Sequence, residues 1–242
     1  MVVKIINAGL LCLAFCAVAA PAHAQVTWTD QGFVNVNVGF QTGSPSLSVT
    51  SPFELYGETG TVSSVTEVST GAMLDVSAGY KAWKNLAVGL GYSTTGGKSD
   101  AAITANVPDP LVFDQLRTVT SSVNDLSHRE HVFYITGTWM IPLTTKADVG
   151  VSFGPAFFSM KQDLPTSVTV TEPIPTVDQA SGEISESGVG FHFGVDGTYL
   201  VTPRIGVGAL LRYTYGSVDI DGAADNLTVG GFQIGIGARF RF

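Results

Sequence analysis

The chain has 242 residues, of which 45% are apolar and 13% charged, and its formal net charge is −8. The apolar share excludes a disordered chain. The acidic balance argues against nucleic acid as a partner, because binding to phosphates needs clustered Lys and Arg. Beyond the N-terminus there is no run of about 18 consecutive apolar residues, so the sequence offers no transmembrane helix.

The first 24 residues show the three parts of a secretory signal peptide. A short positive start ends at Lys4, residues 5–20 are apolar, and Ala22-His23-Ala24 places small residues at the first and third positions. A membrane anchor is the alternative, which the shortness of the apolar stretch disfavours. We expect cleavage after Ala24, a short periplasmic segment over residues 25–31, and a single domain over residues 32–242. Both cysteines, Cys12 and Cys16, lie in the leader, so the exported chain has no disulfide.

From residue 32 onward, apolar and polar residues alternate with the period of two that is typical of β-strands with one apolar face. Eight segments follow this pattern: residues 34–40, 74–80, 86–92, 133–141, 149–157, 189–199, 205–215 and 232–242. Extended by their flanking residues, they reach the roughly nine to eleven residues that a tilted strand needs to cross a bilayer. Helical spacing is not sustained in any segment.

The connections between these strands alternate in length. Short turns lie at residues 83–85, 142–146 and 202–204, whereas long, mostly acidic polar segments lie at residues 42–70, 98–127, 161–187 and 217–226. This alternation predicts an outer-membrane barrel with the short turns and both chain ends on the periplasmic side. Residues 53–56 and 62–68 could extend the barrel above the membrane as hairpins. If they entered the bilayer the strand count would be ten, which Glu54 and Glu67 disfavour.

The second face of each strand decides between a membrane barrel and a soluble sandwich or calyx. It carries mostly Gly, Ser, Thr and Asn with few charges, which suits a narrow lumen better than a water-facing exterior. The aromatic residues of the apolar face fall into two bands, as amphipathic rings do at the two interfaces of a bilayer. The long-loop band is Phe40, Tyr92, Phe133, Phe157, Phe191, Tyr213 and Phe232, and the short-turn band is Tyr80, Trp139, Tyr199, Phe240 and Phe242.

Several charged side chains fall on the inward face. They are Asp75, Lys81, Asp148, His192, Asp196, Arg212, Arg239 and Arg241. Because eight strands leave an interior just wide enough for side chains, these charges must pair or remain at a high desolvation cost. We interpret them as a lumen charge network that plugs the barrel. A continuous pore is the alternative, favoured by the many inward glycines.

No catalytic or metal site emerges from the sequence. His192 and Asp196 share a face but lie about 13 Å apart along a strand, and no matching motif supplies the other members of a triad. His128 and His131 are three residues apart and so face opposite sides of a strand, which makes this segment a solvated strand end rather than a metal site. We therefore predict neither metal nor cofactor. Pro155 cannot donate to a strand ladder, so a bulge or sheet edge is expected there.

The last strand, from Gly231 to Phe242, ends in alternating aromatic and basic residues. With the leader and the eight strands, this chain resembles the small outer-membrane β-barrel proteins of Gram-negative bacteria, of the OmpA, OmpX and OmpW type. The resemblance implies an all-β, eight-stranded antiparallel up-and-down transmembrane β-barrel in the cell outer membrane. It also implies that Phe240 and Phe242 form the assembly signal read by the barrel assembly machinery.

The same resemblance implies a monomer surrounded by outer-membrane lipids and lipopolysaccharide. The expected role is structural, with acidic loops presented outside the cell above a plugged lumen. One alternative is a small OmpW-like channel for minor or apolar solutes, and a third is a lipid A-modifying enzyme.

Overall fold

A computed structural model describes residues 27–42, 47–68, 70–171, 176–218 and 227–242. The expected leader, residues 1–24, lies outside the described residues. The described chain forms antiparallel strands joined by turns. They are β1 (Gly32–Gln41), β2 (Leu47–Leu55), β3 (Glu58–Val68), β4 (Gly71–Trp83), β5 (Leu86–Pro108), β6 (Leu116–Pro142), β7 (Ala147–Thr171), β8 (Thr176–Leu200), β9 (Ile205–Val218) and β10 (Leu227–Arg241).

Eight of these strands close into a barrel. The ring runs β4, β1, β10, β9, β8, β7, β6 and β5, and β5 pairs with both β6 and β4, so the described ring has no free edge. The first and last strands close it, with Phe33 opposite Arg241 and Gln41 opposite Gln233. The predicted eight-stranded up-and-down barrel is therefore confirmed.

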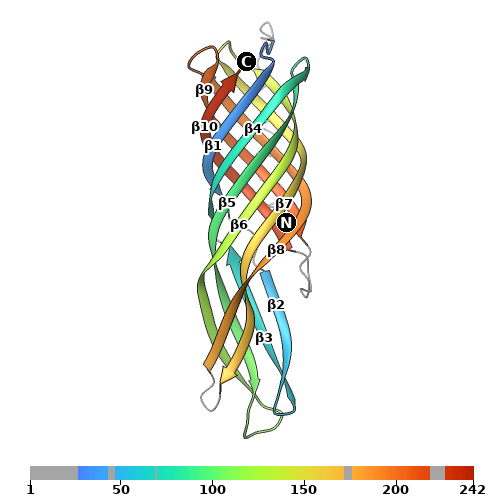
Figure 1. The fold of residues 1–242 in the computed structure, drawn as a ribbon, viewed down its shortest axis with the longest axis vertical. Helices are drawn as coiled ribbons and strands as arrows, with labels where there is room; N and C mark the ends of the chain where they lie inside the picture. The colour runs from blue at the N-terminus through green and yellow to red at the C-terminus, as the bar shows by residue number, and fades with distance from the viewer. Residues whose placement is uncertain (1–26, 43–46, 69, 172–175, 219–226) are drawn as a thin grey trace, which may run out of the picture.

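The remaining two strands form a hairpin outside the ring. β2 pairs with β3, and β3 pairs with the far part of β5, from Ser99 to Asn106. In Figure 1 this hairpin lies in the lower half of the molecule, beyond the ring and at the end opposite the C-terminus. The expectation that residues 53–56 and 62–68 extend the barrel rather than enter it is confirmed.

The prediction of long loops at residues 98–127 and 161–187 is wrong. Strands β5 and β6 contain 23 and 27 residues, and β7 and β8 contain 25 each, so most of residues 98–127 and 161–187 continue the sheet. In β5 the period of two persists, with Ala101, Ile103, Ala105 and Val107 all buried. We call the β2–β3 hairpin together with residues 98–127 of β5 and β6 the extension; it stands beyond the membrane-spanning ring.

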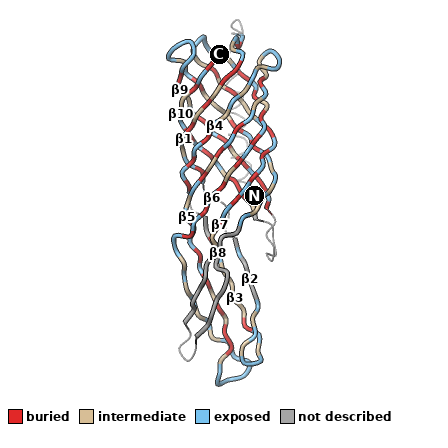
Figure 2. Tube along the Cα trace, in the orientation of Figure 1, coloured by how far each residue is buried: buried red, intermediate tan, exposed pale blue. Residues whose placement is uncertain are grey.

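The faces of the ring strands are arranged as the alternation predicts. Figure 2 shows buried and exposed residues alternating along the strands of the ring. The exposed residues include large apolar side chains such as Phe40, Leu90, Ile236 and Phe242, whereas Asp75, Thr136 and Arg239 are buried in the lumen. Apolar side chains therefore face lipid and polar ones are enclosed. The described residues include no helix of the length and apolarity needed to cross a membrane.

At the short-turn end, the segment that precedes β1 folds into the mouth of the barrel. Trp28 is buried and packs in one apolar cluster with Phe33, Ala87 and Met140. The carbonyl oxygen of Phe242 accepts the N–H groups of Gln31 and Gly32, at 2.7 and 2.9 Å. The described part of the expected periplasmic segment thus enters the barrel mouth.

Candidate functional site in the barrel lumen

Two ion pairs occupy the half of the lumen nearest the short turns. Arg239, with a side-chain exposure of 0%, binds both carboxylate oxygens of Asp196, at 2.9 Å from Nε and 2.6 Å from Nη2. Arg241 donates from Nη2 to Asp148 at 3.1 Å and to Thr198 at 2.8 Å. Both arginines point inward from β10 because they alternate with Phe240 and Phe242, which face lipid.

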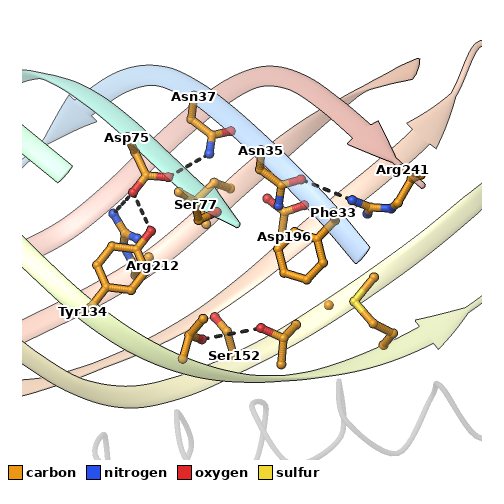
Figure 3. A pocket seen from close by; sticks show the side chains of 15 residues that line it. Phe33, Asn35, Asn37, Asp75, Ser77, Tyr134, Ser152, Asp196, Arg212 and Arg241 are labelled. Atoms are coloured by element: carbon orange, nitrogen blue, oxygen red, sulfur yellow. Dashed lines mark hydrogen bonds and ion pairs between the residues drawn. The ribbon is translucent and has the colours of Figure 1, made fainter. Parts of the chain in front are cut away.

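A third ion pair lies near the middle of the lumen. Arg212 of β9 donates from Nη2 to Asp75 of β4 at 2.7 Å. Tyr134 donates its hydroxyl to the same carboxylate at 2.7 Å, and Asn37 donates to its other oxygen at 2.9 Å. Figure 3 shows these side chains converging on Asp75 from different strands. The guanidinium also lies over the Tyr134 ring, 4.4 Å from its centroid, so this buried carboxylate is surrounded by donors.

Lys81 and His192 do not join these ion pairs. Lys81 lies at the short-turn mouth, where its ammonium donates to the Trp28 carbonyl oxygen at 2.6 Å and lies over the Trp28 ring. His192 is fully buried and packs on Tyr134, with ring centroids 4.7 Å apart. The structure thus brings six of the eight predicted charged residues together as three pairs and places the other two elsewhere.

His192 instead completes the β6–β7 ladder at the proline. In an antiparallel ladder, every second residue pair is hydrogen-bonded. Leu143 donates its N–H to the carbonyl oxygen of Ala147, so Leu143 and Ala147 are such a pair. Counting in steps of two along the β6–β7 register makes Ile135 and Pro155 another. Pro155 has no N–H to give. The Nε2 of His192 donates to the Ile135 carbonyl oxygen at 3.2 Å in its place.

Glycine at position 154 makes this contact possible. A Cβ at Gly154 would lie 1.9 Å from the Ile135 oxygen and 3.2 Å from the His192 Nε2. The bulge expected at Pro155 is absent, because the residue pairs on either side keep one register, but the β6–β7 pairing does lapse at Ile135 and Thr136, opposite Pro155 and Gly154. A side chain from the next strand replaces the missing donor without distorting the sheet.

A second polar layer, which sequence reasoning missed, lies at the mouth of the barrel on the side of the extension. Glu130 accepts hydrogen bonds from Gln41 at 2.7 Å and from His128 at 3.0 Å, and all three side chains are buried. Gln41 also accepts from Thr95 and Gln233. The interpretation of residues 128–131 as a solvated strand end is therefore wrong for His128 and Glu130. His131 does face the opposite side, where it is bonded to Tyr92.

The ring nitrogens of His128 both meet acceptors. Nε2 faces Glu130, and Nδ1 faces the side-chain oxygen of Gln162, whose amide nitrogen is engaged by Ser99. Burial alone would lower the pKa of His128, but its bonds to the Glu130 carboxylate and to Gln162 outweigh burial and raise the pKa above its ordinary value.

The two layers are joined into one hydrogen-bonded chain. Arg212 donates from Nε to Gln233 at 2.6 Å, and Gln233 donates to Gln41, which leads on to Glu130. An apolar cluster lies alongside and includes Val132, Phe158, Met160, Val218 and Val229. The lumen is thus filled by bonded polar groups and packed apolar side chains.

The cavity that remains among the central residues is small. It measures about 40 Å³ and is lined by residues including Asn37, Asp75, Tyr134 and Arg212. Because one water needs roughly 10–15 Å³ by this measure, the space suits a few waters. Each of the three lumen arginines pairs with one lumen aspartate, and Arg241 also lies 4.0 Å from the carboxylate of Asp30 near the short-turn mouth.

Sequence signals for the missed residues exist in part. His128 and Glu130 are two residues apart, which places them on one face of a strand, and that spacing could have identified the pair. No such signal identifies the three glutamines of the network, Gln41, Gln162 and Gln233. An uncharged amide at an inward position does not by itself predict which group it will bond. The predicted assembly residues Phe240 and Phe242 are both exposed on the lipid-facing side.

Comparisons with known proteins identify one family and several similar solved structures. Residues 8–240 match the family model described as the outer membrane protein beta-barrel domain. Among solved structures, Neisserial surface protein A is 14% identical, with 87% of this chain and 97% of that chain covered and a TM-score of 0.44. OprG from Pseudomonas aeruginosa is 12% identical over 88% and 97% of the two chains, with a TM-score of 0.44.

A major outer membrane protein from Thermus thermophilus is 14% identical over 89% of this chain and 100% of its own, with a TM-score of 0.46. No curated protein sequence matches this chain.

Proposed function

Because the chain belongs to the outer membrane protein beta-barrel family and lies in the outer membrane, we propose that it is a closed barrel that presents the extension outside the cell. In this role it neither conducts solutes nor catalyses a reaction. The ring anchors the protein, and the plugged lumen keeps the two sides of the membrane separate.

The network across the lumen is the observation that carries this proposal. Ion pairs from Arg241, Arg239 and Arg212 succeed one another from the periplasmic end, and the Glu130 layer follows at the extracellular mouth. Opening a path would break buried pairs, and leaving one such charge without its partner costs about 3–5 kcal/mol. The network therefore favours a plug over a channel for minor or apolar solutes.

The extension supports the presenting role. Its distal turns are joined where the backbone N–H of Asp114 donates to Glu58 at 2.9 Å. Around this junction apolar side chains are exposed, namely Leu111 at 90% and Phe113 at 81%, with Tyr56, Val112 and Leu116 beside them. A rigid sheet that carries exposed apolar residues away from the membrane is suited to surface contact.

The surroundings of His192 support a structural role for this histidine rather than a catalytic one. Its Nε2 donates to the Ile135 carbonyl oxygen, and its Nδ1 has no partner among the described groups. The residue opposite His192 on β7 is Gly154, which has no side chain to act as a nucleophile. A lipid A-modifying activity would need a base positioned beside a nucleophile, and the described environment of His192 does not provide that pair.

Single-channel recording tests the plug. The purified protein in planar bilayers should show no steady openings, because the lumen pairs hold the path closed. Removing both members of two pairs, as in D75A/R212A/D196A/R239A, leaves no lone charge and should raise the conductance. Steady openings of the wild-type protein would overturn the proposal in favour of a channel. Altered lipid A masses in expressing cells, lost in H192A, would instead establish the enzyme.

Surface labelling tests the presentation of the extension. The only cysteines, Cys12 and Cys16, lie in the leader, so a single new thiol reports on its own position. A membrane-impermeant maleimide added to intact cells should label Phe113→Cys in the extension and spare Thr145→Cys in a short turn. The opposite labelling pattern would invert the orientation and remove the basis of the proposal.

A further inference from the structure

The turn between β5 and β6 carries the most exposed large apolar side chains among the described residues. Leu111 and Phe113 are exposed to 90% and 81%, more than any described apolar side chain that faces lipid in the ring. Figure 1 places this turn and the β2–β3 turn together at the end of the molecule opposite the C-terminus. We call residues 53–60 and 106–118, which form the two turns and their flanks, the tip. Exposed apolar side chains gathered in water are typical of a binding surface.

The backbone of the tip is held by hydrogen bonds within the extension. The N–H of Asp109 donates to a carbonyl oxygen across the turn, and the N–H of Leu111 donates to the Asp109 carboxylate, both at 2.8 Å. The N–H of Asp114 donates to Glu58 of the other turn at 2.9 Å. Pro110 has no N–H to satisfy. Because an unbonded N–H is costly to take out of water, these bonds lower the cost of burying the turn in an apolar phase.

The apolar side chains of the tip project separately into solvent. At their exposures Leu111 and Phe113 have almost no protein neighbours, so they stand out from the tip instead of lining a groove. Tyr56, on the other turn, is exposed as well. A protein partner would need a separate pocket for each projecting side chain, whereas the acyl region of a bilayer accepts all of them without a fixed shape. The exposure pattern therefore favours a bilayer over a protein.

The tip lies too far out to contact the membrane that holds the ring. The stretch of β5 from Ser99 to Pro108 lies beyond the boundary with the ring. At about 3.3 Å per residue and a tilt of about 40°, this stretch places the tip roughly 25 Å above the ring. The polar layer of a bilayer is only about 5–8 Å thick on each side. A bilayer that takes up Leu111 and Phe113 must therefore be a second one that faces the cell.

The charges of the tip select the kind of bilayer. Its acids are Glu54, Glu58, Asp109 and Asp114, and its one cation is Arg117, which lies 3.5 Å from Asp109. This surplus of carboxylates is repelled by the negative surface potential of anionic lipids. A zwitterionic lipid surface carries no such potential. The tip is therefore suited to zwitterionic membranes and unsuited to anionic ones.

We propose that the tip docks on a facing zwitterionic phospholipid bilayer by inserting Leu111 and Phe113 among its lipids. Burying one such side chain strengthens partitioning by about tenfold to a hundredfold. A single tip binds weakly on this basis, and many copies on one surface add up to firm attachment. The inference rests on the proposed function, because only a tip outside the cell can meet another membrane.

The test is co-flotation of the purified protein, held in nanodiscs, with vesicles of phosphatidylcholine or of phosphatidylglycerol. The variant L111S/F113S removes the inserting side chains. The control V65S removes an exposed apolar side chain on β3, outside the tip. Heat-dependent mobility on gels confirms that each variant is folded before binding is measured.

We expect the wild type and V65S to float with phosphatidylcholine vesicles, and L111S/F113S to bind at least about tenfold more weakly. Equal binding by L111S/F113S, or an equal loss in V65S, would overturn the insertion of these two residues. A wild type that binds no phosphatidylcholine vesicles would overturn the docking altogether and leave a protein as the partner of the tip.

An environment-sensitive fluorophore measures insertion directly. Attached to Val112→Cys, it should shift to the blue when phosphatidylcholine vesicles are added and be quenched by lipids labelled in their acyl chains. The same fluorophore on Thr145→Cys, in a short turn, should not respond. Flotation without a shift at position 112 would show adsorption to the lipid surface and overturn insertion.

The lipid class is tested by the acids of the tip. The wild type should bind phosphatidylglycerol vesicles more weakly than phosphatidylcholine vesicles, and E54Q/D114N should reduce the difference. Equal binding to both lipids by the wild type would overturn the selection by charge. These measurements use purified protein, so an inverted orientation in cells would end the proposed function without changing them, whereas absent vesicle binding would leave the closed barrel and its surface labelling intact.

Discussion

The ring and the extension are built from the same strands, yet their two faces carry opposite polarity. In β5, Ser93 and Thr95 face inward within the ring, whereas Ala101, Ile103, Ala105 and Val107 face inward in the extension. The outward residues change in the other direction, from Leu90 and Tyr92 to Asp100 and Thr104. The backbone period is unchanged, and only the surrounding solvent has changed from lipid to water.

This reversal shows that each region is held together by different forces. Inside the ring, the polar groups of the lumen bond mostly to one another, because the lipid outside the barrel cannot hydrogen-bond to the strands. In the extension, apolar burial stabilises the sheet as in a soluble β-protein. The register shift between Ser99 and Ala101, opposite the left-handed Asp125 with φ of 64°, marks the boundary between the two regions.

The largest expected effect comes from breaking a lumen pair. Arg239→Ala leaves Asp196 without its bidentate partner in a buried site, and we expect about 3–5 kcal/mol less stability in urea titrations of the protein in lipid vesicles. Lys98→Ala breaks a fully exposed pair in the extension and should not shift the same transition.

The double variant D196A/R239A separates the two contributions. It removes both charges, so most of the loss seen in R239A should be recovered. An equal loss in the single and double variants would show that packing of the arginine stem, and not the unpaired carboxylate, sets the cost.

The next effect should be confined to the extension. Ile103 is 1% exposed, and Ile103→Ala should cost the extension about 2–4 kcal/mol through the cavity left behind. Limited proteolysis should then cleave β5 or β6 beyond the ring, while the ring keeps its wild-type urea midpoint. If the ring midpoint fell as well, the two regions would unfold together and the comparison between them would fail.

How much of this could be read from the sequence differs between the regions. For the ring, alternation alone predicted the strands, the two faces and the inward position of all six paired charges. The pairing itself could not be predicted, since Asp75 and Arg212 are separated by 137 positions and meet only through the barrel's register. The extension was mistaken for loops because its outward residues are polar and its inward residues are small.

The His128–Glu130 pair and the contact of His192 at Pro155 illustrate a second limit of prediction from the sequence. His128 and Glu130 could have been assigned to one face from their spacing, but their burial depends on Gln41 and Gln162 reaching across the lumen. The role of His192 depends on an N–H that Pro155 lacks on the neighbouring strand and on an acceptor, the Ile135 carbonyl oxygen, two strands away. Such compensation has no local sequence signature, because neither residue is unusual by itself.

A smaller loss of stability is expected at Pro155, where His192 replaces the missing N–H. His192→Ala leaves the Ile135 carbonyl oxygen without a donor in a buried site, at a cost of about 1–3 kcal/mol. Pro155→Ala restores the N–H that the ladder lacks, so H192A/P155A should recover most of the lost stability in the same urea titration. No coupling between the two substitutions would show that His192 stabilises the barrel only through its packing on Tyr134.

The smallest effect concerns pH at His128, at the mouth of the ring where the extension begins. Because its partners raise the pKa of His128 above the unfolded value of 6.5, its contribution is fully present below that pH and is lost as the pH rises through the folded pKa. The loss is small because a neutral imidazole keeps one N–H for Glu130 or Gln162. Urea midpoints between pH 5 and about 9 should therefore fall at the alkaline end in the wild type. His128→Gln, which keeps a hydrogen-bonding side chain without a titratable proton, should show a flatter profile, and an identical slope in both proteins would place the titrating group elsewhere.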